Sequence, residues 1–246
     1  MLELKNISFS VETENGTKKI IDDISLKIDE GFVVITGPNG GGKSTLAKII
    51  AGIIKPTSGK ILLDGEDITD FSITERAVKG ISFAFQQPVR FKGITVHDLI
   101  SLAAGKETSV NDACGYLSQV GLCARDYINR EVNASLSGGE LKRIEIATVL
   151  ARSTKVSLFD EPEAGIDLWS FNNLIKVFEK MHDTLGGSII IISHQERILN
   201  IADKVIVVAN GTIRQEGKRK EILPELLNGA NVACSVLTAN LEGASS

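Results

Sequence analysis

The sequence contains a glycine-rich segment whose residue types and spacing suit phosphate binding. Residues 37–44 read Gly-Pro-Asn-Gly-Gly-Gly-Lys-Ser and fit the pattern G-x-x-x-x-G-K-[ST]. Glycines allow a tight backbone turn in which several N–H groups point at phosphate oxygens, and a following helix adds the positive end of its dipole. In such a loop the lysine, here Lys43, contacts the terminal phosphates, and the hydroxyl of Ser44 binds Mg²⁺.

The flanking segments favour this interpretation over an ordinary glycine-rich turn. The apolar run at 32–36 has the pattern of a buried strand, and residues 44–51 have a helical pattern that ends at Gly52. Phosphate-binding loops occur between such a strand and such a helix. The predicted nucleotide-binding residues of this loop are Gly37, Pro38, Asn39, Gly40, Gly41, Gly42, Lys43, Ser44 and Thr45.

Two carboxylates, Asp160 and Glu161, follow a second apolar run at 156–159. A strand that ends in carboxylates delivers them to the carboxyl edge of an open sheet, where ligands bind. Asp160 is placed to hold Mg²⁺ through its water shell, and Glu161 to orient or deprotonate an attacking water. The alternative is a simple helix cap or turn, which the phosphate loop in the same chain makes less attractive.

The segment Leu-Ser-Gly-Gly-Glu at 136–140 precedes a helical pattern that extends to Ala151. It therefore predicts a second helix start suited to phosphate binding. One nucleotide has no need of two such cradles far apart in the sequence. Two copies of the chain related by a two-fold axis could each supply one cradle to each nucleotide. We therefore predict that Ser137, Gly138 and Gly139 contact nucleotide bound to the partner copy.

These segments resemble those of the ABC ATPase family, whose characteristic sequence is LSGGQ or close to it. Three further segments occur in the family's order: Gln86 in Phe-Gln-Gln-Pro at 85–88, Asp167 in Ala-Gly-Ile-Asp at 164–167, and His194 in Ile-Ser-His at 192–194. The resemblance implies that Gln86 senses Mg²⁺ and the water, and that His194 lies near the γ-phosphate. It implies ATP as substrate with Mg²⁺ held by Ser44, Gln86 and Asp160, and Glu161, His194 and Gln86 as catalytic residues.

Two positions depart from the family pattern. Glu140 replaces the commoner glutamine, and we expect its carboxylate to face the helix start rather than phosphate. Most family members stack adenine on an aromatic residue of the first strand, whereas Val11 occupies that place here, with Phe9 two residues earlier. Phe9 is either an alternative platform or part of the core.

The remaining pattern predicts the elements that position these residues. Alternating segments at 2–11 and 20–28 are typical of half-buried strands, and apolar runs at 81–85, 188–192 and 204–208 of further strands. Helical patterns near 168–183 and 194–202 alternate with the later strands, and the stretch 96–151 is almost wholly helical. The resulting fold class is α/β, a P-loop ABC fold with a mixed sheet and a helical insertion. We expect one domain over 1–228, with its helical subdomain at 96–151 and a loosely held tail at 229–246.

Composition excludes several other classes. The net charge of −4 gives no basic footprint for nucleic acid. Cys114, Cys123 and Cys234 form neither a CxxC pair nor a zinc pattern. No stretch approaches the roughly 18 apolar residues of a membrane span, so we expect a cytoplasmic chain that reaches a membrane only through another protein.

Local segments within the family resemble the Suf-type (SufC) iron–sulfur cluster assembly ATPases. They are residues 83–89, residues 137–146 and the run His-Gln-Glu-Arg-Ile-Leu at 194–199. The resemblance implies a soluble SufB/SufD-like scaffold as partner, docked around residues 87–105. The alternative is the ATP-binding subunit of a membrane transporter with a transmembrane permease as partner. A DNA-repair ATPase is disfavoured because the chain is acidic and lacks a long coiled-coil insertion.

Overall fold

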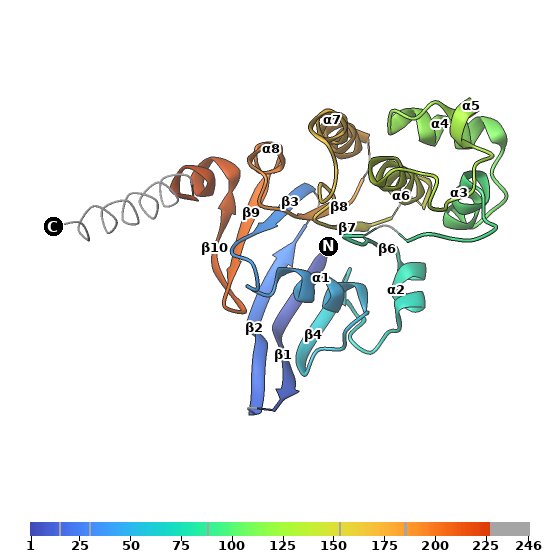
Figure 1. Cartoon of the computed structure of the whole chain (residues 1–246). Coiled ribbons are helices and arrows are strands. Elements are labelled where there is room, and N and C mark those ends of the chain that lie inside the picture. The colour runs from blue at the N-terminus through green and yellow to red at the C-terminus, as the bar shows by residue number, and fades with distance from the viewer. Residues whose placement is uncertain (15, 30, 88, 153, 185, 227–246) are drawn as a thin grey trace.

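The computed structural model describes residues 1–14, 16–29, 31–87, 89–152, 154–184 and 186–226. Its strands form two sheets (Figure 1). The larger sheet has six strands in the order β10-β9-β3-β8-β7-β6, and all neighbours are parallel except β9 and β10. Its strands are β3 (Gly31–Thr36), β6 (Ile81–Ala84), β7 (Val156–Asp160), β8 (Ser188–Ile192), β9 (Lys204–Ala209) and β10 (Thr212–Lys218).

The smaller sheet is antiparallel, in the order β2-β1-β4-β5. Its strands are β1 (Leu2–Thr13), β2 (Gly16–Ile28), β4 (Ser58–Leu63) and β5 (Glu66–Asp67). β1 and β2 form a long hairpin that closes where Thr13 pairs with Gly16. The alternating pattern of these segments is that of strands with one buried face, as the sequence predicts.

The parallel strands are apolar throughout because both of their faces are covered. All five residues of β7 and of β8 are buried. In β3, Phe32 and Val34 belong to the core beneath the helices, whereas Val33 and Ile35 face the core shared with α1 and the antiparallel sheet. The large sheet therefore separates two hydrophobic cores, and its carboxyl edge is left for the loops that follow its strands.

The helices cover the sheet on both sides (Figure 1). α1 lies on the side of the antiparallel sheet, and α6, α7 and α8 lie on the opposite side of the large sheet, while α3, α4 and α5 gather at the end far from β10. The helices are α1 (Lys43–Ala51), α2 (Ile73–Lys79), α3 (Val96–Ala104), α4 (Val110–Gln119), α5 (Ala124–Tyr127), α6 (Gly138–Arg152), α7 (Leu168–Thr184) and α8 (Glu196–Leu199).

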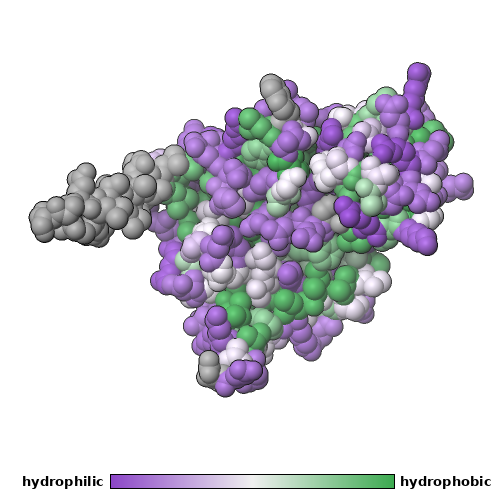
Figure 2. All heavy atoms as spheres, viewed as in Figure 1, coloured by the Kyte–Doolittle hydropathy of each residue, from purple (hydrophilic) through white to green (hydrophobic). Residues whose placement is uncertain are grey.

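α2 is a helix that the sequence analysis missed, although it begins with a capping box between Ser72 and Glu75. Two of its hydrophobic side chains, Ile73 and Val78, are 53% and 80% exposed. Figure 2 shows a band of hydrophobic surface across the lower half of the viewed face, where Figure 1 draws α1 and α2. This helix therefore presents apolar surface to solvent.

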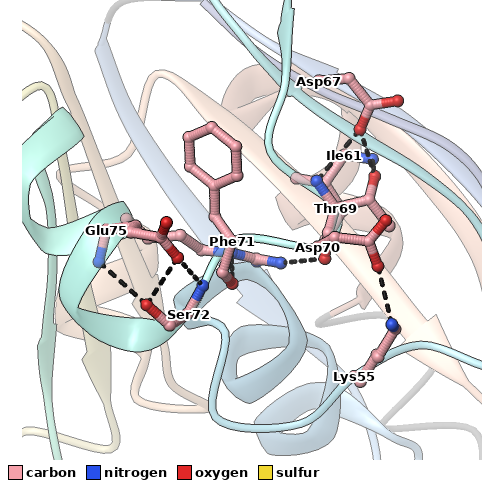
Figure 3. Close-up of polar contacts among 9 residues, drawn as sticks. Lys55, Ile61, Asp67, Thr69, Asp70, Phe71, Ser72 and Glu75 are labelled. Atoms are coloured by element: carbon pink, nitrogen blue, oxygen red, sulfur yellow. Dashed lines mark hydrogen bonds and ion pairs between the residues drawn. The ribbon is translucent and has the colours of Figure 1, made fainter.

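A buried arginine ties α2 to the end of α1. Arg76 is 1% exposed, and its guanidinium donates to the carbonyl oxygens of Ile49 (2.6 Å) and Ile50 (2.8 Å) in the last turn of α1. It also donates to the carbonyl oxygens of Thr69 (2.8 Å) and Phe71 (3.3 Å), in the turn that leads into α2 (Figure 3). The carbonyl oxygens of Ile49 and Ile50 lie in the last turn of α1, where a helix leaves carbonyls without intrahelical partners, and that of Ile49 also accepts from the N–H of Gly52 at 3.1 Å.

The parallel core and the helical stretch agree with the sequence prediction. The helix predicted at 194–202 is shorter, because α8 spans only Glu196–Leu199. The predicted tail at 229–246 lies outside the described residues. Among the residues that the structure describes, no helix is both long and apolar enough to cross a membrane.

Candidate nucleotide site

The loop between β3 and α1 forms one wall of an open cavity of about 530 Å³, a size typical of small-ligand sites. The other lining residues come from β2 and from the segments that follow β6 and β7. The residues that line it are Lys18, Ile20, Asn39, Gly40, Gly41, Gly42, Lys43, Ser44, Thr45, Gln86 and Glu161. The structure thus brings most of the predicted loop together with Gln86 and Glu161.

Two glycines of this loop, Gly37 and Gly42, have a positive φ that residues with a side chain rarely adopt. At Gly37 φ is 134°, and a Cβ would lie 2.1 Å from the carbonyl oxygen of Val208. Gly42 precedes α1 with φ 104° and makes no side-chain cap, and the first turn of α1 has no acidic residue. Among the described residues, the N–H groups at the start of α1 therefore have no side-chain acceptor, and they suit an anion.

Lys43 lies in the loop with 5% of its surface exposed. Its ammonium donates to the carbonyl oxygens of Gly37 (2.8 Å) and Pro38 (2.9 Å). Burial lowers the pKa of Lys43, and the charges of Glu161 and Asp160 act in the opposite direction. The two carbonyl oxygens are neutral and compensate the buried positive charge only in part. Phosphate oxygens bound in the cavity would supply the Lys43 ammonium with anionic partners.

The predicted Mg²⁺ residues Ser44 and Asp160 are in direct contact. The Ser44 hydroxyl donates to Asp160 Oδ1 at 2.9 Å, and Asp160 is 3% exposed. Burial raises the pKa of Asp160, and the hydrogen bond from Ser44 opposes that shift. A hydroxyl and a carboxylate are hard oxygen donors, so this pair fits Mg²⁺, which would neutralise the buried carboxylate and the phosphate charge.

Glu161 follows β7 with its backbone in the left-handed region, at φ 44°. Its N–H donates to the carbonyl oxygen of Ile192, at 3.0 Å, which holds this conformation. Gln86 Nε2 donates to Glu161 Oε2 at 2.5 Å. The contact arises because β6 and β7 are parallel neighbours, with Ala84 paired to Phe159.

His194 follows β8 and is exposed. It is not among the residues that line the cavity, so the structure places it beyond the immediate wall. The preceding residue, Ser193, is fully buried, and its hydroxyl donates to Glu163 Oε1 and accepts from the N–H of Gln195. Glu163 is a residue that sequence analysis missed, since nothing in its spacing marks it.

The Ser137–Gly139 segment forms the start of α6 and does not line the cavity. Ser137 and Gly138 are exposed. Glu140 Oε2 accepts from the N–H of Ser137 at 2.7 Å, and its other oxygen accepts from the Tyr127 hydroxyl. This confirms the expectation that the Glu140 carboxylate faces the helix start.

No residue that lines the cavity, within the described part of the chain, is aromatic. Phe9 is half-buried and packs against the core of the antiparallel sheet, which favours the core alternative. Val11 pairs with Lys18, and Lys18 and Ile20 of β2 line the cavity instead. Sequence analysis missed both β2 residues, because only the hairpin register brings them to the loop.

This arrangement of loops on a mixed sheet defines a P-loop nucleotide hydrolase. The chain belongs to the ABC transporter ATPase family, since a family model described as ABC transporter matches residues 21–164. The fold class predicted from sequence is thereby confirmed.

Curated relatives support the same family. The chain is 38% identical to the uncharacterized ABC transporter ATP-binding protein MJ0035 of Methanocaldococcus jannaschii, over 84% of this chain and 86% of that protein. It is 34% identical to the energy-coupling factor transporter ATP-binding protein EcfA1 of Mycoplasma mobile, over 91% and 82%. It is 33% identical to the sulfate/thiosulfate import ATP-binding protein CysA of Bordetella bronchiseptica over 84% of this chain, which spans 60% of that relative.

Solved structures share the fold. The dimeric ATP-binding cassette MJ0796, in a post-hydrolysis state bound to ADP and Pi, aligns with a TM-score of 0.80 and 26% identity over 89% of this chain and 99% of that one. The cassette cbiO1 from Clostridium perfringens, part of the ABC transporter complex cbiONQ, aligns with a TM-score of 0.75 and 28% identity over 98% of both chains. The protein is therefore an ATP hydrolase that binds ATP with Mg²⁺.

Proposed function

We propose that this chain is the ATP-hydrolysing subunit of a two-fold dimer that drives a conformational change in a membrane permease. Each ATP is held by the loop at 37–45 of one copy and by the segment at 137–139 of the other. Glu161 orients the attacking water, Gln86 and His194 assist it, and Asp160 and Ser44 hold Mg²⁺. Closure excludes water from the site, and hydrolysis allows it to open again.

One observation carries the dimer. The cavity of a single chain is open, and Ser137 and Gly138 are exposed at the start of α6 without lining it. Ser137 and Gly138 would therefore contact a triphosphate only if that triphosphate were bound to the loop at 37–45 of a second copy of the chain. The relative MJ0796, described as a dimeric cassette, supports the same arrangement.

A test of the dimer uses two variants that damage different halves of the site. Lys43→Ala removes the phosphate-binding cation, and Ser137→Glu places a negative charge in the opposite cradle. Each variant alone should lack ATPase activity. An equal mixture should regain part of it, because a mixed dimer contains one site with both intact halves. A mixture no more active than its separate components would contradict a shared site.

The permease is proposed because relatives named for sulfate/thiosulfate import and energy-coupling factor transport match most of this chain. Two adjoining apolar cavities, of about 230 and 180 Å³, lie beside the segment that carries Gln86. Phe83, Phe85, Glu145 and Thr148 line both. Phe85, Val89 and Ile73 around them are 40%, 47% and 53% exposed, an apolar surface suited to a partner segment.

The second candidate partner is the scaffold of Suf-type cluster assembly. It rests on the segments at 83–89, 137–146 and 194–199 alone, and no relative or solved structure named above is described as a Suf protein. Both candidates leave this chain with the same ATPase chemistry in the cytoplasm, and they differ in whether the partner is soluble.

Purification of the tagged chain from its own cells, with and without detergent, separates the two partners. A polytopic protein recovered only with detergent supports the permease, and a soluble scaffold recovered without detergent supports the Suf reading. Phe85→Glu or Val89→Glu should reduce recovery of the partner, while Val110→Glu on α4, also exposed, serves as the control. Phe91 is unsuitable for this test, because it packs against the core.

A further inference from the structure

The backbone of Phe85 is held by two side chains of α6. Its N–H donates to Glu145 Oε1 at 3.0 Å, and its carbonyl oxygen accepts a hydrogen bond from the ammonium of Lys142. Lys142 Nζ also bonds Glu145 Oε2 at 2.9 Å. Three hydrogen bonds therefore close a ring around both backbone polar groups of one residue.

This ion pair is deeply placed. The Lys142 side chain is 2% exposed and that of Glu145 is 17% exposed. Burial raises the pKa of Glu145, and the charge of Lys142 opposes that shift. Apolar side chains of similar volume often stabilise a protein as well as a buried ion pair, so stability alone gives no account of this pair.

Phe85 lies between the last paired residue of β6 and Gln86, which contacts Glu161. β6 ends at Ala84, the last residue paired with β7, so the ladder does not hold Phe85. The next residue, Gln86, lines the nucleotide cavity and donates to Glu161. The direction of the Gln86 side chain therefore depends on how the Phe85 backbone is fixed.

We propose that Lys142 and Glu145 are a positioning pair that sets Gln86 against Glu161. Because both lie on α6, whose first turn carries Gly138 and Gly139, the pair also connects that helix to the water-orienting end of the site. The inference rests on the ATPase activity and on this contact chain. It does not depend on which partner the protein serves.

The test replaces the pair without leaving a lone buried charge, in the variant Lys142→Met/Glu145→Met. We expect kcat for ATP hydrolysis by the isolated chain to fall about tenfold or more, since small misplacements of catalytic groups have large effects. KM for ATP should stay unchanged, because the loop at 37–45 is untouched. Lys79→Met/Glu66→Met removes an exposed pair, 2.6 Å apart on α2 and β5, and should leave both constants unchanged.

A double-mutant cycle with Gln86→Ala separates positioning from a general structural role. If the pair acts through Gln86, adding the two methionines to Gln86→Ala should cause no further loss of kcat. If the methionine pair does not fold, Lys142→Arg keeps the charge, displaces the donor from the Phe85 carbonyl, and should lower kcat with KM unchanged.

Wild-type kcat in the folded methionine pair, or in Lys142→Arg if that variant is used, would overturn the proposal. Losses of kcat that multiply with the loss caused by Gln86→Ala would also overturn it. A joint change of kcat and KM would overturn it as well, because that result is expected if the pair only holds α6 on the sheet. Failure here leaves the dimer test with Lys43→Ala and Ser137→Glu unaffected, so the two proposals can fail separately.

Discussion

Glu161 combines a reactive carboxylate with a backbone conformation that is uncommon outside glycine. Its φ of 44° lies in the left-handed region, a costly conformation for a glutamate. The hydrogen bond to the carbonyl oxygen of Ile192 and the contact with Gln86 hold it there. Such strain is common where a side chain must point at a reacting group.

Glu161→Gln tests this role at the level of one carboxylate. The amide has the same shape but cannot take a proton from water, so we expect hydrolysis to fall by about 10²- to 10⁴-fold, the range of general base catalysis. ATP binding should remain, since the loop is intact. Phosphate release and nucleotide titration measure the two quantities, and Glu179→Gln on the exposed side of α7 is the control. Unaltered phosphate release would remove Glu161 from the mechanism.

At the scale of elements, Arg76 joins α2 to the end of α1 through four carbonyl oxygens. Arg76→Met leaves those of Ile49 and Ile50 buried without this donor. We expect the free energy of unfolding to fall by about 2–4 kcal/mol, as for the loss of buried charged hydrogen bonds. Urea unfolding measures it, with the exposed Arg214→Met as control. A loss no larger than the control's would show that water replaces the guanidinium.

Glu163 connects the loop after β7 to the loop after β8. Its Oε1 accepts a hydrogen bond from the hydroxyl of Ser193, the residue before His194. Within the part of the chain that the structure describes, its other carboxylate oxygen is buried without a hydrogen-bond partner. Burial raises the pKa of Glu163 above its ordinary 4.5, while Ser193 and the charge of His194 act against the shift. The loop after β7 therefore carries a carboxylate that is costly to ionise.

This shift predicts a pH dependence. The folded chain binds the proton of Glu163 more tightly than the unfolded chain, so wild-type stability is fully present below the unfolded pKa and falls as pH rises through the folded pKa. Glu163→Gln cannot ionise and escapes that loss. Its unfolding free energy relative to wild type should therefore rise as pH increases from below 4.5, the ordinary pKa of the group, through the raised pKa of the folded chain. A difference that stays constant with pH in urea unfolding would show that Glu163 is not shifted.

For the whole molecule, an open site and an exposed cradle predict assembly that depends on nucleotide. Glu161→Gln should elute from gel filtration as a dimer with ATP and Mg²⁺ and as a monomer without them, because bound ATP is no longer hydrolysed. Adding Ser137→Glu should abolish the dimer. A variant that remains monomeric at saturating ATP would contradict closure by this chain alone.

The sequence by itself determined the phosphate loop, the carboxylates after β7, the helical stretch and the family resemblance. These features are local, because glycine spacing, apolar runs and helix starts are set by backbone chemistry within a few residues. Even the orientation of Glu140 followed from its place three residues after Ser137, as in other helix caps.

Only the tertiary structure decided which distant residues meet. Gln86 and Glu161 touch because β6 and β7 are neighbours in the sheet, and Lys18 reaches the loop through the register of the β1–β2 hairpin. The clamp of Lys142 and Glu145 on Phe85 depends on how α6 packs on the sheet. Strand order, register and helix packing are set by burial summed over the whole chain, so no short segment encodes them.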